Sequence, residues 1–120
     1  SYFEEILCSY GLCQIHDNKD FVKVLNECWR VLKPEGIFKI LVPNAIYPET
    51  TFRDPMDNRW FVKESFDHLN YEHYRWQKMG KYDGFKPWRI LKVEEIAGDV
   101  NLEKKDRLLV KMSPYKEIGE

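Results

Sequence analysis

Polar side chains that could take part in ligand chemistry directly follow two short apolar segments. Ser9 and Tyr10 come after residues 6–8 (ILC), and Asn44 comes after residues 37–42 (IFKILV) and one proline. Apolar runs of this kind are typical of buried parallel strands, and open α/β sheets bind ligands beyond the carboxyl ends of their strands. The sequence therefore predicts that these side chains lie on the ligand side of a sheet.

The stretch after the second apolar segment, residues 44–58, has no regular periodicity. A connection of this length inside a compact domain is more often functional than idle. With the residues just after it, the stretch combines aromatic and polar side chains, namely Tyr47, Phe52, Asp54, Arg59, Trp60 and Phe61. Such a mixture can line a substrate pocket. The alternative, which we favour, is that the aromatic residues after Tyr47 anchor the loop on the core while Asp54 caps a turn.

Histidine and cysteine, which often serve as general bases and metal ligands, form no convincing site here. The residues are His16, His68 and His73 among the histidines and Cys8, Cys13 and Cys28 among the cysteines. No histidine has a nucleophile or paired carboxylates nearby in the sequence, so each is expected on the surface or in packing contacts. The cysteines are odd in number, lack a CxxC motif and match no zinc spacing. We therefore expect reduced core cysteines and no metal.

The balance of charges excludes several classes of partner. With 19 basic and 20 acidic residues the formal net charge is −1, so no overall field draws the chain to nucleic acid or to an anionic membrane. Basic and aromatic residues alternate over 71–88 like a stacking platform for single-stranded nucleic acid, but Glu72 and Asp83 dilute this pattern. No apolar run approaches the roughly 20 residues of a membrane helix. Without a signal-like N-terminal segment, the chain is expected to be soluble and cytoplasmic.

The elements that must position these residues begin with a helix between the two apolar segments. Asp17 or Asn18 offers an N-cap, and Asp20 places a negative charge in the first turn. Apolar residues then recur at helical spacing, and they are Phe21, Val24, Leu25, Cys28, Trp29 and Leu32. Residues 33–36 (KPEG) should end the helix, because proline cannot continue it and glycine accepts the positive φ of a tight turn. Strand, helix and strand in this order predict a right-handed βαβ unit and a parallel sheet.

The second half of the chain predicts one short helix and two strands. The helix is expected over 64–74, with Phe66, Leu69 and His73 on its apolar face, before a turn-rich link. The strands are expected to pair antiparallel. They are residues 88–94 and 107–112, joined through Gly98, Asp99 and Asn101. At 120 residues the chain is the size of one modest domain, so residues 1–120 are interpreted as one unit.

Several of these segments resemble a known family. Residues 3–12 (FEEILCSYGL), 30–36 (RVLKPEG) and 37–43 are similar to the fourth strand, the end of the following helix and the fifth strand of class I S-adenosylmethionine-dependent methyltransferases. Residues 54–67 (DPMDNRWFVKESFD) resemble the aromatic loop of a type 11-like subgroup, which leads into a helix near the substrate. The closing strands would match the sixth and seventh strands. The resemblance implies the C-terminal half of an α/β Rossmann-like domain, with parallel strands and a C-terminal antiparallel strand pair.

The resemblance also implies site residues. In the family, residues after the fourth strand touch the methionine portion of S-adenosylmethionine, and this role falls here on Ser9, Tyr10 and Gln14. Contacts to a small-molecule substrate of unknown identity would fall on Asn44, Tyr47, Asp54 and Arg59. Gln14 and Asp57 stand where relatives often carry histidines, and no catalytic base is assigned.

Two cofactor-binding features of the family have no counterpart. The chain has no GxGxG-like turn after a strand, which lets the backbone approach the cofactor, and no acidic residue placed to hold the ribose. We expect both upstream of Ser1, and so expect no useful binding of S-adenosylmethionine by this chain alone. Residues 6–8 would then border an uncovered sheet edge, through which we expect self-association into a homo-oligomer. The alternative function is a non-catalytic oligomerisation or interaction module derived from a methyltransferase fold.

Overall fold

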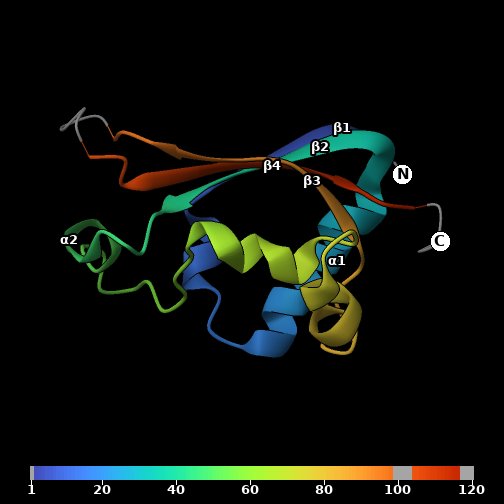
Figure 1. Ribbon diagram of the computed structural model, residues 1–120, viewed down its shortest axis with the longest axis horizontal. Helices are drawn as coiled ribbons and strands as arrows, with labels where there is room; N and C mark the ends of the chain where they lie inside the picture. Colours follow the sequence, from blue (N-terminus) through green and yellow to red (C-terminus); the bar gives the residue numbers. More distant parts are fainter. Residues whose placement is uncertain (1, 99–103, 117–120) are drawn as a thin grey trace.

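The computed structural model describes residues 2–98 and 104–116, and these form a mixed α/β structure on one four-stranded sheet (Figure 1). The strands are β1 (Phe3–Ser9), β2 (Leu32–Pro43), β3 (Trp88–Ile96) and β4 (Arg107–Pro114), and their order in the sheet is β1-β2-β4-β3. β1 pairs parallel with β2, and β4 pairs antiparallel with both β2 and β3. The predicted parallel pair and closing antiparallel pair are confirmed. Asp99 and Asn101 of the predicted connection lie outside the described residues.

The helical segments lie together on one side of this sheet, below it in Figure 1. They are the main helix α1 (Asn18–Val31), the 3-10 helices η1 (Gly11–Gln14) and η2 (Lys63–Leu69), the single turn α2 (Pro48–Thr51) and the π-helical turn η3 (Trp76–Gly80). Because these segments all lie on one side, the core lies between one face of the sheet and this helical layer.

None of the helices in the described ranges has both the length and the apolar character needed to cross a membrane.

The helix α1 forms as its cap and its apolar spacing predict. The side chain of Asp17 accepts hydrogen bonds from the backbone N–H groups of Lys19 and Asp20, at 2.7 and 3.3 Å. The cap satisfies donors that have no partner inside the first turn. The buried face of the helix consists of Phe21, Leu25 and Trp29. The indole N–H of Trp29 donates to the carbonyl oxygen of Pro87 at 2.7 Å, which ties the helix to the start of β3.

The junction between α1 and β2 differs from the predicted tight turn. Leu32 is buried as expected, but it is already the first residue of β2. Residues 33–36 therefore belong to the strand, and Gly36 does not have the positive φ that the turn would require. Glycine is needed there for space, because a Cβ atom would lie 2.9 Å from the carbonyl oxygen of Lys33. Val24, expected on the apolar face of the helix, is exposed.

The helical part of the second half is shorter than predicted. η2 ends at Leu69 and buries Phe66 and Leu69, so the helix expected over 64–74 does not include His73. The π-helical turn η3 was not predicted, because its aromatic and basic residues show no helical periodicity. It is held by Trp76, whose buried indole N–H donates to the carbonyl oxygen of Phe85 at 3.1 Å.

The first strand is less buried than its apolar run predicts, and it lies at a sheet edge, as expected for residues 6–8 in this chain. β1 pairs with β2 along one edge, and its other edge has no partner strand among the described residues. Leu7 is 65% exposed, while Ile6 and Cys8 are half-buried. The edge position explains this exposure, because nothing in the described chain packs beyond β1.

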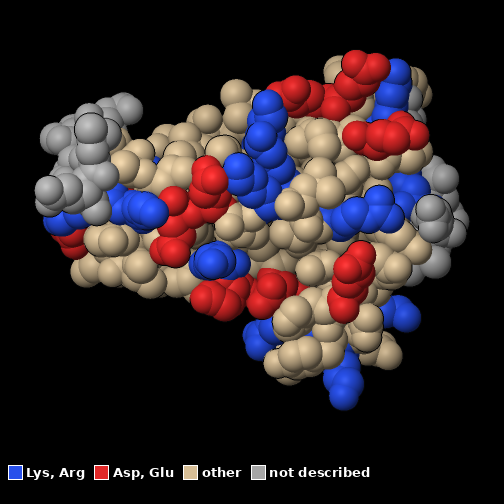
Figure 2. Space-filling model, turned by 45° about the horizontal axis from the view of Figure 1, so that its top comes forward, with Lys and Arg blue, Asp and Glu red and all other residues tan. Residues whose placement is uncertain are grey.

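The sheet face opposite the helices carries a mixture of charged and apolar side chains. Every second residue from Phe38 to Val42 is buried against the helical layer, so Lys39 points to the other face. Lys39 lies opposite Lys111 of β4 and forms an ion pair with Glu5 of β1 at 3.0 Å. Figure 2, with the top of Figure 1 turned toward the viewer, shows basic and acidic side chains interspersed on this side. The face is therefore mixed in charge.

Candidate functional site

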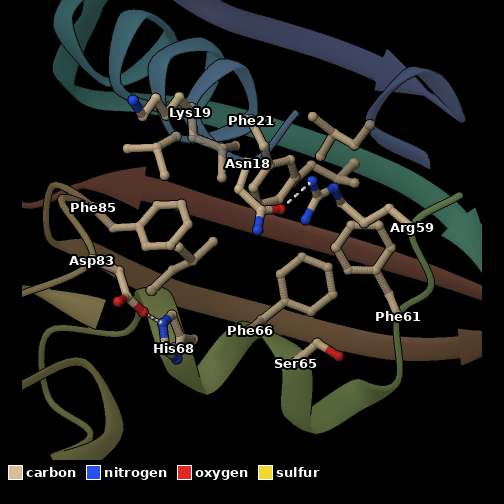
Figure 3. A pocket seen from close by; sticks show the side chains of 15 residues that line it. Asn18, Lys19, Phe21, Arg59, Phe61, Ser65, Phe66, His68, Asp83 and Phe85 are labelled. Atoms are coloured by element: carbon tan, nitrogen blue, oxygen red, sulfur yellow. Dashed lines mark hydrogen bonds and ion pairs between the residues drawn. The ribbon is translucent and has the colours of Figure 1, made fainter. Parts of the chain in front are cut away.

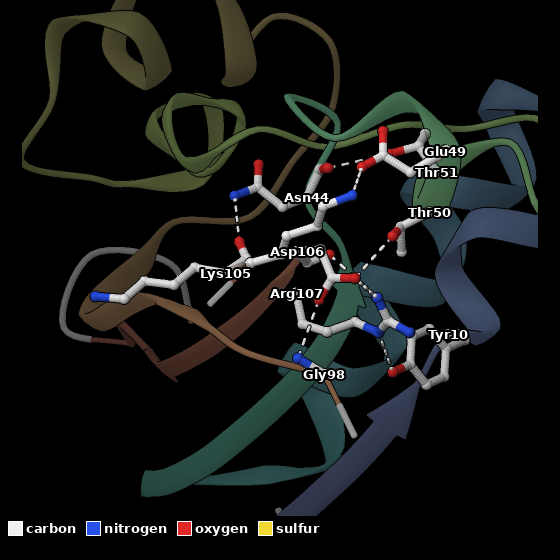
Figure 4. Close-up of polar contacts among 10 residues, drawn as sticks. Tyr10, Asn44, Glu49, Thr50, Thr51, Gly98, Lys105, Asp106 and Arg107 are labelled. Carbon is white, nitrogen blue, oxygen red and sulfur yellow. Dashed lines mark hydrogen bonds and ion pairs between the residues drawn. The ribbon is translucent and has the colours of Figure 1, made fainter. Parts of the chain in front are cut away.

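The carboxyl ends of β1 and β2 meet the start of β4 in a set of polar contacts, which we call the Asp106 network (Figure 4). It consists of Tyr10, Thr50, Gly98, Asp106 and Arg107. Asp106 accepts from the Thr50 hydroxyl at 2.7 Å and the Gly98 N–H at 3.0 Å, and its Oδ2 lies 2.9 Å from Nη1 of Arg107. Burial alone would raise the pKa of Asp106, but these three donors outweigh it and lower the pKa. The buried carboxylate is therefore held in its ionised form.

Tyr10, a predicted cofactor contact, joins this network to the end of β1. Its φ of 66° lies in the left-handed region, which is uncommon for a residue other than glycine. This backbone turns the chain from β1 into η1 and directs the Tyr10 hydroxyl to Arg107, whose Nε donates to it at 2.9 Å. Ser9, the other residue at this strand end, is exposed. Only Ser9 thus presents its side chain openly to solvent at this end of β1.

Asn44, a predicted substrate contact, is turned into the interior. It is 1% exposed, and its Nδ2 donates to Oε2 of Glu95 at 2.8 Å and to the carbonyl oxygen of Lys105 at 3.1 Å. Its Oδ1 accepts from the Ile46 N–H at 3.4 Å. The side chain therefore links the end of β2 to β3 and to the start of β4. Tyr47 follows as the half-buried residue before α2.

Two other predicted residues meet although they are far apart in the sequence. Gln14 donates from Nε2 to Oδ2 of Asp54 at 3.2 Å. The backbone N–H groups of Asn58 and Arg59 both donate to the carbonyl oxygen of Cys13, at 2.9 and 3.1 Å. The loop after β2 therefore folds back onto the turn after β1. This brings a predicted cofactor contact, Gln14, against a predicted substrate contact, Asp54.

The same loop shows how far the anchoring interpretation holds. Asp54 caps a turn as expected, because its Oδ1 accepts from the Met56 N–H at 2.9 Å. Phe61 is buried and anchors the loop. Phe52 and Trp60 do not, since they are 61% and 52% exposed and pack edge-on against each other, with ring centroids 5.4 Å apart. Anchoring therefore rests on Phe61, and the other two rings stay at the surface.

Asp57, at a position where the resemblance implies a histidine, belongs to the same loop. Its Oδ1 is buried and has no hydrogen-bond partner within the described part of the chain. Burial and the negative charge of Asp54 raise the pKa of Asp57, although a hydrogen bond from Gln14 acts in the opposite direction. Burial likewise raises the pKa of Cys13 to about 12, with Asp57 adding to the effect. Both pKa shifts are in the direction that favours the neutral form.

A cavity of about 580 Å³ opens between α1 and η2 on the helical side of the sheet (Figure 3), and we call it the aromatic cavity. Its apolar wall includes Phe21, Phe61, Phe66, Phe85, Leu12, Leu25, Ile40 and Leu69. Its polar lining consists of Asn18, Lys19, Arg59, Ser65, His68 and Asp83. A volume of this size with apolar walls and a few polar groups is typical of small-molecule sites.

Arg59 is the predicted substrate contact that lines this cavity. Its guanidinium carbon lies 3.9 Å from the ring centroid of Phe21, and Nε and Nη2 donate to the carbonyl oxygen of Ile15 at 3.3 and 3.2 Å. Nη2 also donates to Oδ1 of Asn18 at 2.9 Å. Burial lowers the pKa of Arg59. Within residues 2–98 and 104–116, no carboxylate forms an ion pair with this guanidinium.

His68 and Asp83 lie across the cavity from Arg59 (Figure 3). Nε2 of His68 lies 2.7 Å from Oδ2 of Asp83, and Nε of Arg75 lies 3.4 Å from Nδ1. Because arginine only donates, Nδ1 is the acceptor and Nε2 carries the proton shared with Asp83. The sequence predicted His68 and His73 only as surface or packing residues. The structure gives each a carboxylate neighbour, since His73 lies 3.6 Å from Asp67.

The cysteines agree only in part with the expectation of reduced core thiols. All three cysteines are free, but Cys13 alone is buried and Cys8 and Cys28 are half-buried. In the described ranges, histidine, cysteine and acidic side chains form no group able to hold a metal ion.

Comparison with known proteins assigns no family, because no family model and no curated protein matches the chain.

Proposed function

We propose that this chain is part of an S-adenosylmethionine-dependent methyltransferase domain with a partial Rossmann-like fold, acting on a small molecule. One observation carries the proposal. The turn after β1 and the loop after β2, where the resemblance puts the methyl donor and the acceptor, are in contact through Gln14 and Asp54. The β1–α1–β2 unit with its parallel strands, followed by an antiparallel last strand, supports it further.

The residues at the end of β1 would contact only the methionine portion of S-adenosylmethionine. Ser9 and the backbone around Tyr10 are placed at a ligand-side strand end, but the chain has no glycine-rich turn and no acid for the ribose. When bound, S-adenosylmethionine would supply the methyl group. The contribution of Ser9, Tyr10 and Gln14 would be to orient its methionine portion, since methyl transfer depends largely on alignment of the two reactants.

Titration of the isotope-labelled chain with S-adenosylhomocysteine, followed by NMR, tests this proposal. We expect weak binding, with an affinity in the millimolar range, and amide shifts at Ser9, Tyr10 and Gln14. Adenosine, which lacks the methionine portion, is the matched control and should not shift these amides. Shifts that are absent, or that adenosine reproduces, would count against the proposal. Micromolar affinity in a calorimetric titration would refute the expectation that this chain alone binds the donor poorly.

A second candidate, a non-catalytic module that associates with a copy of itself, is favoured by the free edge of β1. This edge exposes Leu7 and Phe3 next to unpaired backbone donors and acceptors. The opposite edge, on β3, is protected. There Tyr71 donates its N–H to the carbonyl oxygen of Trp88 at 2.9 Å, and a register shift between Ile90 and Lys92 makes the pairing of β3 with β4 irregular. Two copies could pair along β1 about a two-fold axis.

Sedimentation velocity at micromolar concentration tests the second candidate. Leu7→Lys puts a charge on the free edge at an exposed position, and it should weaken association at least tenfold. Leu91→Lys is the matched control, since Leu91 is an exposed leucine of the protected edge strand. A wild-type chain that stays monomeric, or equal effects of the two variants, would rule out association through β1.

A further inference from the structure

We propose that the aromatic cavity binds an amphipathic carboxylate, a small molecule with an apolar body and one carboxylate group paired with Arg59. The cavity is formed by α1, η2 and the segment that follows Asn58. The inference shares Arg59 with the predicted substrate contacts. It involves no methyl donor and does not use Ser9, Tyr10 or Gln14, so binding of the carboxylate can be tested separately from binding of the donor.

The walls select an apolar, preferably aromatic, body. The rings of Phe61 and Phe66 stack with centroids 5.5 Å apart, and Phe21 lies 6.2 Å from Phe61 and 5.9 Å from Phe85. A further ring can join this cluster in the offset or edge-on arrangements that aromatic groups prefer. An apolar ligand that enters the cavity leaves water for an apolar surrounding, which is favourable.

The guanidinium of Arg59 selects a negative charge. Its position is fixed by Ile15 and Asn18 on one side and by the ring of Phe21, so it needs little ordering when a ligand binds. Nη1 has no hydrogen-bond partner among the described residues, and no carboxylate there balances the charge. A half-buried guanidinium without a counter-charge binds carboxylates well, because its N–H groups match the two carboxylate oxygens.

The other charges of the lining do not compete for this role. The carboxylate of Asp83 lies at the far side of the cavity and is engaged with His68 at 2.7 Å. Lys19 is an exposed residue of the first turn of α1, and it adds a second positive charge at the rim. The lining therefore contains two positively charged side chains, Arg59 and Lys19, and one carboxylate, which favours an anion over a cation or a neutral ligand.

Calorimetric titration with 3-phenylpropionate and with its neutral isostere 3-phenylpropan-1-ol tests the proposal. We expect the acid to bind at least tenfold more tightly than the alcohol. Arg59→Gln should reduce this preference to twofold or less and leave the affinity for the alcohol unchanged. Arg53→Gln is the matched control, because Arg53 is an exposed arginine of the same connection and does not line the cavity.

Two further measurements keep the proposal falsifiable if Arg59→Gln does not fold. Arg59→Lys keeps the charge but lacks the planar fork, so it should retain only part of the preference. NMR shifts of the wild-type chain with 3-phenylpropionate should map to Phe66 and Phe85, and not to Ser9, Tyr10 and Gln14, whose amides report donor binding. Equal binding of acid and alcohol, no binding of either, or shifts away from the cavity would overturn the proposal.

Discussion

The Asp106 network and the aromatic cavity both hold a charged side chain away from bulk solvent, but they compensate its charge differently. Asp106 is surrounded by donors of Thr50, Gly98 and Arg107, all within 3.0 Å. These donors keep the carboxylate ionised although it is buried. Arg59 rests on the Phe21 ring and on neutral oxygen atoms, with no carboxylate of the described chain beside it.

This difference indicates separate roles. A buried charge whose partners all belong to the chain serves the fold, and removing one partner leaves the others unpaired. A charge that faces a cavity without a counter-charge contributes less to the fold and is available to a ligand. The Asp106 network, at the ligand-side strand ends where a site was predicted, is thus the more closed of the two regions. The aromatic cavity, on the helical side of the sheet, is the open one.

The largest expected effect comes from removing the centre of the network. Asp106→Ala should lower the free energy of unfolding by about 3 kcal/mol, because Arg107 loses its ion-pair partner and the Thr50 hydroxyl its acceptor in a buried setting. Urea denaturation measures this change. Asp83→Ala, at the rim of the cavity, is the matched control and should cost less than about 1 kcal/mol, since the Asp83 side chain is 59% exposed. Similar costs for the two variants would remove the distinction between the regions.

A second expected effect is a dependence of stability on acid. The pKa of Asp106 is lowered in the folded chain, so its contribution is complete above the unfolded pKa of about 3.9 and is lost as the pH falls through the lower folded value. The difference in unfolding free energy between the wild type and Asp106→Asn should therefore shrink below about pH 4. Chemical denaturation between neutral and acidic pH measures it. A difference that stays constant would mean that the carboxylate is not held ionised.

The first half of the fold could be predicted because its signals are local. The cap at Asp17 and the spacing of Phe21, Leu25 and Trp29 define α1 without any knowledge of distant contacts. The junction after it was less predictable. Proline and glycine over 33–36 suggested a turn, whereas the structure uses Gly36 to avoid a clash inside a strand. Local sequence does not distinguish these two reasons for glycine.

The candidate sites depend on contacts between distant segments, which the sequence pattern does not contain. Asp106 meets Thr50 across 56 positions, and His68 meets Asp83 across a turn-rich link. Asn44 was placed correctly at the end of β2, but its side chain points inward, because buried partners compete for its amide. Arg59 was predicted as a substrate contact from the composition of its loop and from the resemblance. The cavity that it lines depends on Phe66 and Phe85, which the sequence suggested only as packing or nucleic-acid-stacking residues.

The smallest expected effect is the most informative for the cavity. Arg59→Gln should change the free energy of unfolding by no more than about 1 kcal/mol, measured by urea denaturation, because two contributions oppose each other. The variant loses hydrogen bonds to Ile15 and Asn18 and the contact with Phe21. It also removes a charge that burial disfavours, as the lowered pKa of Arg59 indicates. A loss as large as that of Asp106→Ala would show that Arg59 is required by the fold. The Arg59 guanidinium would then have a structural role like that of the Asp106 network. Its lack of a counter-charge would no longer indicate a ligand site.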